Sequence, residues 1–164
     1  MMGSRRWAGA CLAALVLALA GCASAPKPPA DAVSGPWSGR LALQVQDRPS
    51  ESFSAGFELK GSALAGELQL FSPIGGTLAV LDWQPGRARL QANSRTREFA
   101  SVDALMTELS GAAIPVRALF DWLRGIATPV AGWQADLSQL AHGRIAAKRL
   151  DPLPEADLRV VLER

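Results

Sequence analysis

The sequence predicts a mainly β domain with a helical insert, in which a strongly curved antiparallel sheet carries two short helices on its concave side. From Trp37 onward, apolar residues alternate with small or polar ones, which is the period of a strand with one buried face. Glycine, proline and asparagine divide this pattern into short segments, as tight turns between strands require. Between residues 101 and 125 the apolar period changes to that of an α-helix, and strand character returns after residue 132.

The first part of the predicted sheet is a meander of short strands joined by turns. Turn residues stand at positions 60–62, 84–87 and 93–94, each between two alternating segments, and a last segment covers residues 96–99. Neighbouring strands joined by tight turns pair antiparallel. The apolar positions expected to alternate along these strands are Leu41, Leu43, Val45, Phe53, Ala55, Phe57, Leu59, Leu64, Leu68, Leu70, Leu78, Val80, Ala88, Leu90 and Ala92.

Two short helices are predicted after this meander. Ser101 is a favourable N-cap for a helix that ends at Gly111, and Pro115 suits the start of a second helix that ends at Gly125. Their apolar residues recur at helical spacing: Val102, Leu105, Met106 and Leu109 in the first, and Ala118, Leu119, Trp122 and Leu123 in the second. Further strands are then expected at residues 133–137, 144–150 and 158–162.

The N-terminal residues have the layout of a bacterial lipoprotein export signal. Arg5 and Arg6 precede an apolar stretch over residues 10–20, which is shorter than the roughly 20 apolar residues that a membrane-spanning helix needs. Residues 19–22, Leu-Ala-Gly-Cys, match the lipobox. We therefore interpret residues 1–21 as a signal peptide and Cys22 as the lipidated first residue of the mature chain.

One tether and one domain are predicted after the signal peptide. Ala23, which follows the cysteine, favours the outer membrane as the destination, with the domain facing the periplasm. Residues 22–36 are rich in proline and small residues, which favours an extended, flexible tether behind the lipid anchor. Residues 37–164 then form the predicted domain.

Composition and charge argue against nucleic-acid binding and against catalysis. The chain has 17 Lys and Arg, 15 Asp and Glu, and a formal net charge of +2, which comes from the two arginines of the signal peptide. The mature chain is therefore neutral and lacks the basic surface that nucleic acids require. Both cysteines precede residue 23 and the single histidine, His142, lies in a predicted turn, so we expect no metal site, no cofactor and no enzymatic activity.

Two surface features are candidates for binding. Ile74 stands between a proline and two glycines in a connection that should be polar, so it either projects from a tight turn or folds back onto the core. A cluster of Arg87, Arg89, Arg95 and Arg97 surrounds one predicted hairpin turn. This cluster is either a solvated edge or a patch that meets an acidic partner or anionic headgroups.

Four segments of the sequence resemble LolB, the family of outer-membrane lipoprotein receptors of Gram-negative bacteria. They occur in the order seen in that family: residues 37–42 (Trp-Ser-Gly-Arg-Leu-Ala), 53–57 (Phe-Ser-Ala-Gly-Phe), 70–77 (Leu-Phe-Ser-Pro-Ile-Gly-Gly-Thr) and 114–125 (Ile-Pro-Val-Arg-Ala-Leu-Phe-Asp-Trp-Leu-Arg-Gly). The resemblance covers roughly residues 37–162. Family members usually have a longer C-terminal end, whereas here a short hairpin leads directly into residues 158–162.

The resemblance implies a fold and a transport function. The family fold is an incomplete, half-open antiparallel β-barrel with short helices covering the concave face and a hydrophobic cavity beneath them. A member accepts triacylated lipoproteins from a periplasmic LolA-like carrier and inserts them into outer-membrane lipid without using a nucleotide. The resemblance also implies a monomer and a membrane-insertion loop at Pro73, Ile74, Gly75 and Gly76, in which Ile74 takes the place of a protruding leucine.

The candidate residues for an acyl-chain cavity come from the apolar faces of the predicted strands and helices. An apolar void of several hundred Å³, the usual scale of a ligand pocket, would favour the receptor function. A filled core would favour a structural or scaffolding lipoprotein that binds a protein partner. The candidates are Leu41, Leu43, Phe53, Phe57, Leu68, Leu70, Leu78, Val80, Leu105, Met106, Leu109, Leu119 and Trp122.

Overall fold

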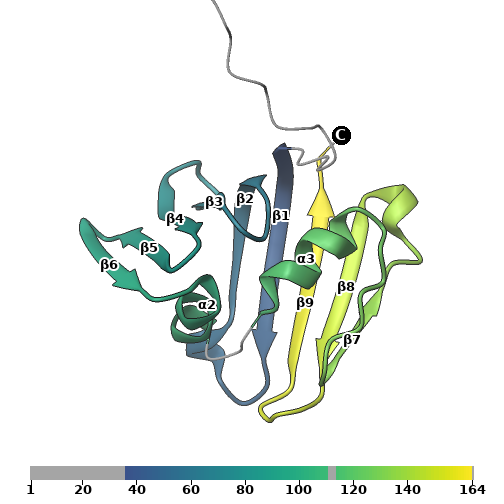
Figure 1. The fold of residues 1–164 in the computed structure, drawn as a ribbon. Helices are drawn as coiled ribbons and strands as arrows, with labels where there is room; N and C mark the ends of the chain where they lie inside the picture. The colour runs from purple at the N-terminus through teal and green to yellow at the C-terminus, as the bar shows by residue number, and fades with distance from the viewer. Residues whose placement is uncertain (1–35, 111–113, 164) are drawn as a thin grey trace, which may run out of the picture. The chain divides into compact units, whose positions relative to one another are not determined.

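The computed structural model describes residues 36–110 and 114–163, and in these residues the fold is mainly β. The strands form one nine-stranded antiparallel sheet, drawn in Figure 1. The signal peptide, Cys22 and most of the tether lie outside the described residues. The strands are β1 (Pro36–Val45), β2 (Phe53–Gly61), β3 (Gly66–Phe71), β4 (Thr77–Gln84), β5 (Arg87–Ala92), β6 (Arg95–Phe99), β7 (Trp133–Asp136), β8 (Arg144–Arg149) and β9 (Ala156–Leu162).

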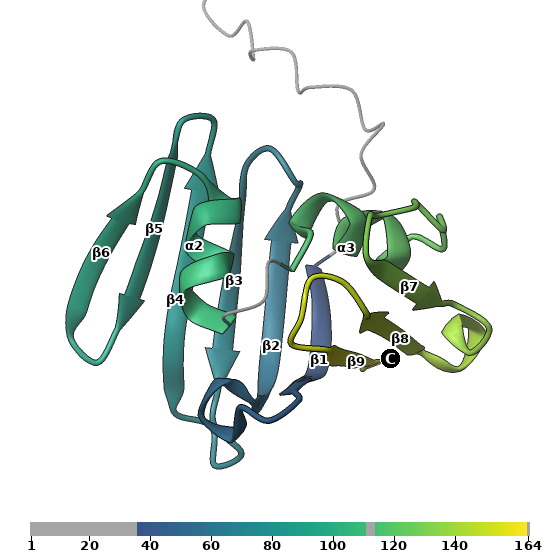
Figure 2. The same ribbon diagram turned by 90° about the horizontal axis from the view of Figure 1, so that it is seen from below.

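Strand β1 lies inside the sheet, with strands on both sides of it. Strands β1 to β6 follow one another in chain order as a meander, while β9 pairs with the other side of β1 and is followed by β8 and β7. Figure 2 shows the two groups of strands on either side of β1. Within the described residues β6 and β7 are the two edges and do not pair with each other, so the sheet is not closed.

One face of the sheet is buried and carries the core, as the alternation predicted. In β1, for example, Leu41, Leu43 and Val45 are buried, and the residues between them are half-buried or exposed. The same alternation appears in β2, β3 and β5 at the predicted positions, although Phe53 at the start of β2 and Ala92 at the end of β5 are only half-buried. Leu64 lies in the β2–β3 turn, where it is exposed. Burial of these side chains is the main favourable contribution to folding.

The predicted phase of β4 is wrong. Ala79, Leu81 and Trp83 are buried, whereas Leu78 is exposed and Val80 is half-buried. The cause is an irregularity in the pairing of β3 with β4, which leaves Leu78 without a partner and shifts the register by one residue. A shift of one residue moves every following side chain to the opposite face.

Both predicted helices are present, as α2 (Val102–Ser110) and α3 (Val116–Leu123). Residues 111–113, and with them the predicted stop at Gly111, lie outside the described residues. Gly125 ends α3 as predicted, with a positive φ of 82°. Its N–H donates to the carbonyl of Trp122, and the N–H of Ile126 donates to the carbonyl of Asp121, which satisfies the last carbonyls of the helix.

Two further short elements are 3₁₀ turns, at Pro49–Glu51 and Leu140–His142. Among the described residues, no helix has both the length and the apolar character needed to cross a bilayer.

The N-cap of α2 gives a first testable prediction. The hydroxyl of Ser101 accepts a hydrogen bond from the N–H of Ala104 at 3.1 Å. We expect Ser101→Ala to lower the free energy of unfolding by about 1 kcal/mol, because that N–H loses its acceptor. Urea unfolding followed by circular dichroism measures the change, and Ser101→Asp, which restores an acceptor, should retain the stability of the unchanged chain. Equal stability of the alanine and aspartate variants would contradict a capping role for Ser101.

Candidate functional site

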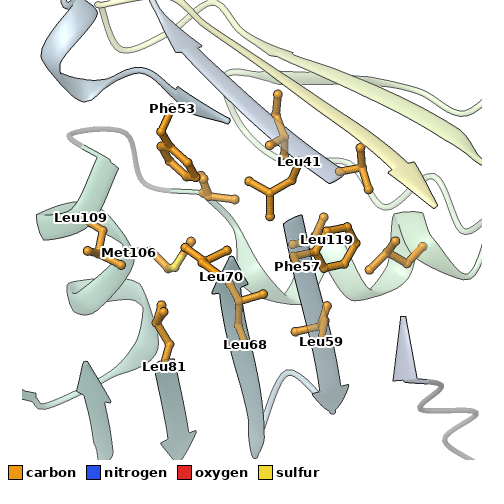
Figure 3. Close-up of a pocket in the computed structure, with 14 residues that line it drawn as sticks. Leu41, Phe53, Phe57, Leu59, Leu68, Leu70, Leu81, Met106, Leu109 and Leu119 are labelled. Atoms are coloured by element: carbon orange, nitrogen blue, oxygen red, sulfur yellow. The ribbon is translucent and has the colours of Figure 1, made fainter. Parts of the chain in front are cut away.

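An apolar cavity lies between the buried face of the sheet and the two helices. Figure 3 shows the labelled side chains gathered around it from strands and helices together. Every lining residue is aliphatic, aromatic or methionine, and none offers a charged or hydroxyl group. The lining residues are Leu41, Phe53, Phe57, Leu59, Leu68, Leu70, Leu81, Met106, Leu109, Ile114, Leu119, Leu123, Leu158 and Val160.

The structure brings many of the sequence-predicted cavity candidates together. Candidates that line the cavity are Leu41, Phe53, Phe57, Leu68, Leu70, Met106, Leu109 and Leu119. Leu43, Leu105 and Trp122 are instead packed into the core away from the cavity. Leu78 and Val80 lie on the other face of β4, because the pairing of β3 with β4 is shifted by one residue.

Sequence reasoning missed several lining residues. Leu59 continues the alternation of β2 and was available from the pattern, as were Leu158 and Val160 in the last strand. Leu81 takes the place of the misassigned β4 residues. Ile114 precedes α3, in a segment whose path no periodicity predicts.

The cavity is small in this structure, with a volume of about 40 Å³. A site that holds a drug-sized ligand usually measures roughly 300–1,000 Å³. The lining side chains therefore leave little free space between them. An acyl chain enters only if part of the wall moves.

Aromatic contacts hold α3 in place. The ring of Phe120 lies edge-on to Trp37 of β1 at 5.5 Å and to Trp83 of β4 at 6.3 Å between centroids. Trp122 packs against Trp133 of β7, with centroids 6.3 Å apart, and its indole N–H donates to the carbonyl of Thr128 at 3.1 Å. These rings tie α3 to β1, β4 and β7, and such pairs contribute beyond their buried area.

The wall formed by α2 is tied to the sheet by contacts of another kind. Its element contacts are to the peripheral strands β5 and β6. It contributes Met106 and Leu109 to the cavity, and an exposed ion pair joins Glu108 to Arg97 of β6 at 2.7 Å. Exposed ion pairs contribute little to stability, and methionine adapts readily to changes in shape.

The loop between β3 and β4 projects Ile74 into solvent. Its side chain is 96% exposed, so it does not fold back onto the core. The turn is internally hydrogen-bonded: the N–H of Ser72 donates to the carbonyl of Gly76, and the N–H of Gly75 donates to the carbonyl of Ser72. Gly75 has a positive φ of 88°, which glycine adopts without strain. The result is an ordered turn with an aliphatic side chain at its tip.

The arginine cluster is largely neutralised by neighbouring carboxylates. Arg87 pairs with Glu98 at 2.6 Å, and Arg89 pairs with Asp82 at 2.8 Å. The hydrogen bond from Arg89 to Asp82 raises the pKa of that arginine. These pairs are solvent-exposed, which favours a solvated edge over a strongly positive patch.

Comparison with known proteins decides the family. The family model described as "Outer membrane lipoprotein LolB" matches residues 36–151, which is most of the chain and includes β1 to β4, both helices and the Ile74 loop. The chain belongs to the LolB family. LolB proteins are outer-membrane lipoproteins, and the lipid-anchored location at the outer membrane follows for this chain.

Relatives named "Outer-membrane lipoprotein LolB" cover much of the chain. The protein of Bordetella petrii is 32% identical over 175 residues, covering 90% of this chain and 86% of the relative. That of Cupriavidus pinatubonensis is 36% identical, covering 92% of this chain and 75% of the relative. That of Bordetella parapertussis is 38% identical, covering 73% of this chain and 63% of the relative.

Proposed function

We propose that this LolB-family chain, an outer-membrane lipoprotein receptor in lipoprotein localisation, binds the acyl chains of its cargo in the apolar cavity and inserts the cargo into the outer membrane. The cargo would be triacylated lipoproteins delivered by a soluble periplasmic LolA-like carrier. The observation that carries the proposal is the lining of the cavity, which is apolar at every position. Hydrocarbon is the ligand class that such a lining stabilises, with about 0.8 kcal/mol for each buried CH₂ group.

In this proposal the open sheet is a half-open barrel whose concave face is covered by α2 and α3. The mature chain would begin with a lipidated Cys22, and the tether to residue 36 would let the domain work at a distance from its anchor. Each chain would act as a monomer, because one domain supplies the cavity and the projecting loop. Transfer would run without a nucleotide, towards the environment that buries the acyl chains most favourably.

The cavity would enlarge by displacement of α2. Its volume of about 40 Å³ does not accommodate an acyl chain. Helix α3 is tied to β1, β4 and β7 by aromatic rings, whereas α2 contacts β5 and β6 and contributes Met106 to the lining. Helix α2 would move first, and acyl chains would replace the contacts that it makes with the sheet.

A transfer assay tests the proposal directly. The full-length lipidated chain is reconstituted into liposomes and mixed with a carrier–lipoprotein complex. We expect the lipoprotein to cross-link to this chain and then to appear free in the bilayer. A lipoprotein without acyl chains should remain in solution, because nothing in the cavity recognises a peptide. Equal cross-linking of the acylated and unacylated forms would exclude acyl-chain binding.

A scaffolding role is the second candidate, and the small volume of the cavity favours it. A core that stays filled would serve a structural lipoprotein that binds a protein partner through a sheet edge. In the same assay a scaffold would leave the acylated lipoprotein on an active carrier.

A further inference from the structure

Arg149 is a buried charge on the face of the sheet that lines the cavity. It ends β8, where it pairs with Trp133 of β7 and Ala156 of β9, and its exposed fraction is 4%. It is the sole charged residue among the buried residues of the described chain. Arginine is almost never fully buried unless it is paired, so this position requires a physical explanation.

The guanidinium of Arg149 is incompletely satisfied. Its Nη2 donates to the carbonyl oxygen of Pro154 at 2.7 Å, while its Nε is buried and has no hydrogen-bond partner. Among the described residues, no carboxylate forms an ion pair with it. Burial lowers the pKa of Arg149 and nearby Arg48 lowers it further, while the charge of Glu51 acts in the opposite direction. The side chain nevertheless remains charged, because arginine keeps its proton in proteins.

On the sheet, Arg149 lies one inward residue pair beyond the lining of the cavity. Ala156 faces Arg149 across the β8–β9 pair, and Leu158, a lining residue, is the next inward residue of β9. Diagonal neighbours of this kind lie within reach of a long side chain. Ala147, the next inward residue on β8 itself, is small and fills little of the intervening space. The unpartnered N–H thus belongs to a charged group that lies one inward residue pair beyond a hydrocarbon-lined site, beside the Pro154 carbonyl.

We propose that Arg149 binds the ester carbonyl oxygen at the polar end of an acyl chain held in the cavity. The inference rests on the proposed acyl-chain function and adds a polar contact to it. The first oxygen that follows the hydrocarbon of an acyl chain is its carbonyl, and a carbonyl oxygen accepts a hydrogen bond from a guanidinium. This hydrogen bond would keep the ester group beside Arg149, and it would thereby fix how deeply the acyl chain enters the cavity.

A pair of synthetic lipopeptides isolates this contact. One carries two ester-linked acyl chains, and the other carries ether-linked alkyl chains of the same length, so the pair differs only in the carbonyl oxygens. Both bear the same photoreactive group, and cross-linking to the full-length chain in lipid nanodiscs is measured against concentration. We expect the unchanged chain to prefer the ester form by about tenfold or more, as a hydrogen bond to a charged group implies.

Arg149→Met should abolish that preference while binding of the ether form remains. Arg144→Met is the matched control, because Arg144 lies on the same strand but on its exposed face. A diacyl phospholipid and its dialkyl analogue, added as competitors, distinguish a membrane lipid from a lipoprotein as the source of the ester. If the diacyl phospholipid competes better than its dialkyl analogue, and this difference disappears in Arg149→Met, then Arg149 also binds the ester of a membrane lipid.

Two results would overturn the inference. One is equal binding of ester and ether forms by the unchanged chain, which is decisive even if Arg149→Met does not fold. The other is a preference that survives in Arg149→Met, with a lowered melting temperature, which would make Arg149 a structural support for the Pro154 carbonyl. Neither result affects the proposed function, which would fail in this experiment if the unchanged chain bound neither lipopeptide.

Discussion

Ile74→Glu is expected to block delivery of lipoproteins into the bilayer while their acceptance from the carrier remains unchanged. Ile74 lies on an ordered turn with its side chain in solvent, so the substitution disturbs no packing. The free energy of transfer into hydrocarbon is about 3 kcal/mol less favourable for a charged side chain than for an aliphatic one. If the tip must enter the bilayer for release, that cost corresponds to a reduction in delivery of roughly 100-fold.

The measurement separates the two steps in one preparation. The variant chain is anchored in liposomes and given a carrier–lipoprotein complex, and lipoprotein bound to the chain is separated from lipoprotein free in the bilayer by immunoprecipitation. We expect bound lipoprotein to accumulate on Ile74→Glu. Ile74→Leu should deliver at the normal rate, because it retains an aliphatic tip.

Leu64→Glu is the matched control for a charge on an exposed turn. Leu64 lies in the turn between β2 and β3, and its side chain is 75% exposed. This change should leave both acceptance and delivery unaltered. Normal delivery by Ile74→Glu would remove the loop from the mechanism, and an equal defect in Leu64→Glu would attribute the effect to charge on the protein surface in general.

The sequence predicted most of the sheet because its strands have one buried and one exposed face. Ala88 and Leu90 alternate with arginine and glutamine in β5, and this pattern is compatible with a single orientation of the strand. The helices were equally well specified, since Ser101 and Gly125 provide a cap and a stop that depend on local chemistry alone. Where local chemistry decided the structure, the prediction was confirmed.

The prediction failed where both faces of a strand are apolar. Residues 78–81 read Leu-Ala-Val-Leu, a run that fits either phase, and a pairing irregularity in the preceding turn region selects the phase. Alternation therefore assigned Leu78 and Val80 to the cavity where the structure places Leu81. Long-range pairing, which no local pattern contains, decided this strand.

The residues of the candidate site also differed in how far the sequence predicted their exposure. The sequence around Ile74 was equally compatible with a side chain projecting from the turn and with one folded onto the core, and the structure shows it exposed. Arg149 gave no signal at all, because an arginine at the end of a strand is ordinarily exposed. Its burial results from the meeting of β7, β8 and the segment at Pro154, which only the three-dimensional structure brings together.

Phe120→Ala is expected to produce the largest loss of stability, because one ring joins α3 to two distant strands. The side chain is 1% exposed and contacts Trp37 of β1 and Trp83 of β4, two strands that are separated in the sheet by β2 and β3. Removal of a buried phenylalanine side chain costs about 3–5 kcal/mol, through lost burial and the space left behind. A typical domain is stable by about 5–15 kcal/mol, so this loss is a large part of the total.

Urea unfolding of Phe120→Ala measures that loss, and Phe120→Leu, which keeps most of the apolar volume, should lose less. Met106→Ala provides the comparison on α2, where the side chain borders existing free space and the wall is proposed to yield. Native-state hydrogen exchange then tests the asymmetry between the helices: amides of α2 should open at a lower free energy than those of α3. Equal protection of both helices, or a loss in Phe120→Ala below about 1 kcal/mol, would contradict the conclusion that α3 is the fixed wall, since buried aromatic contacts of this size cost several times more.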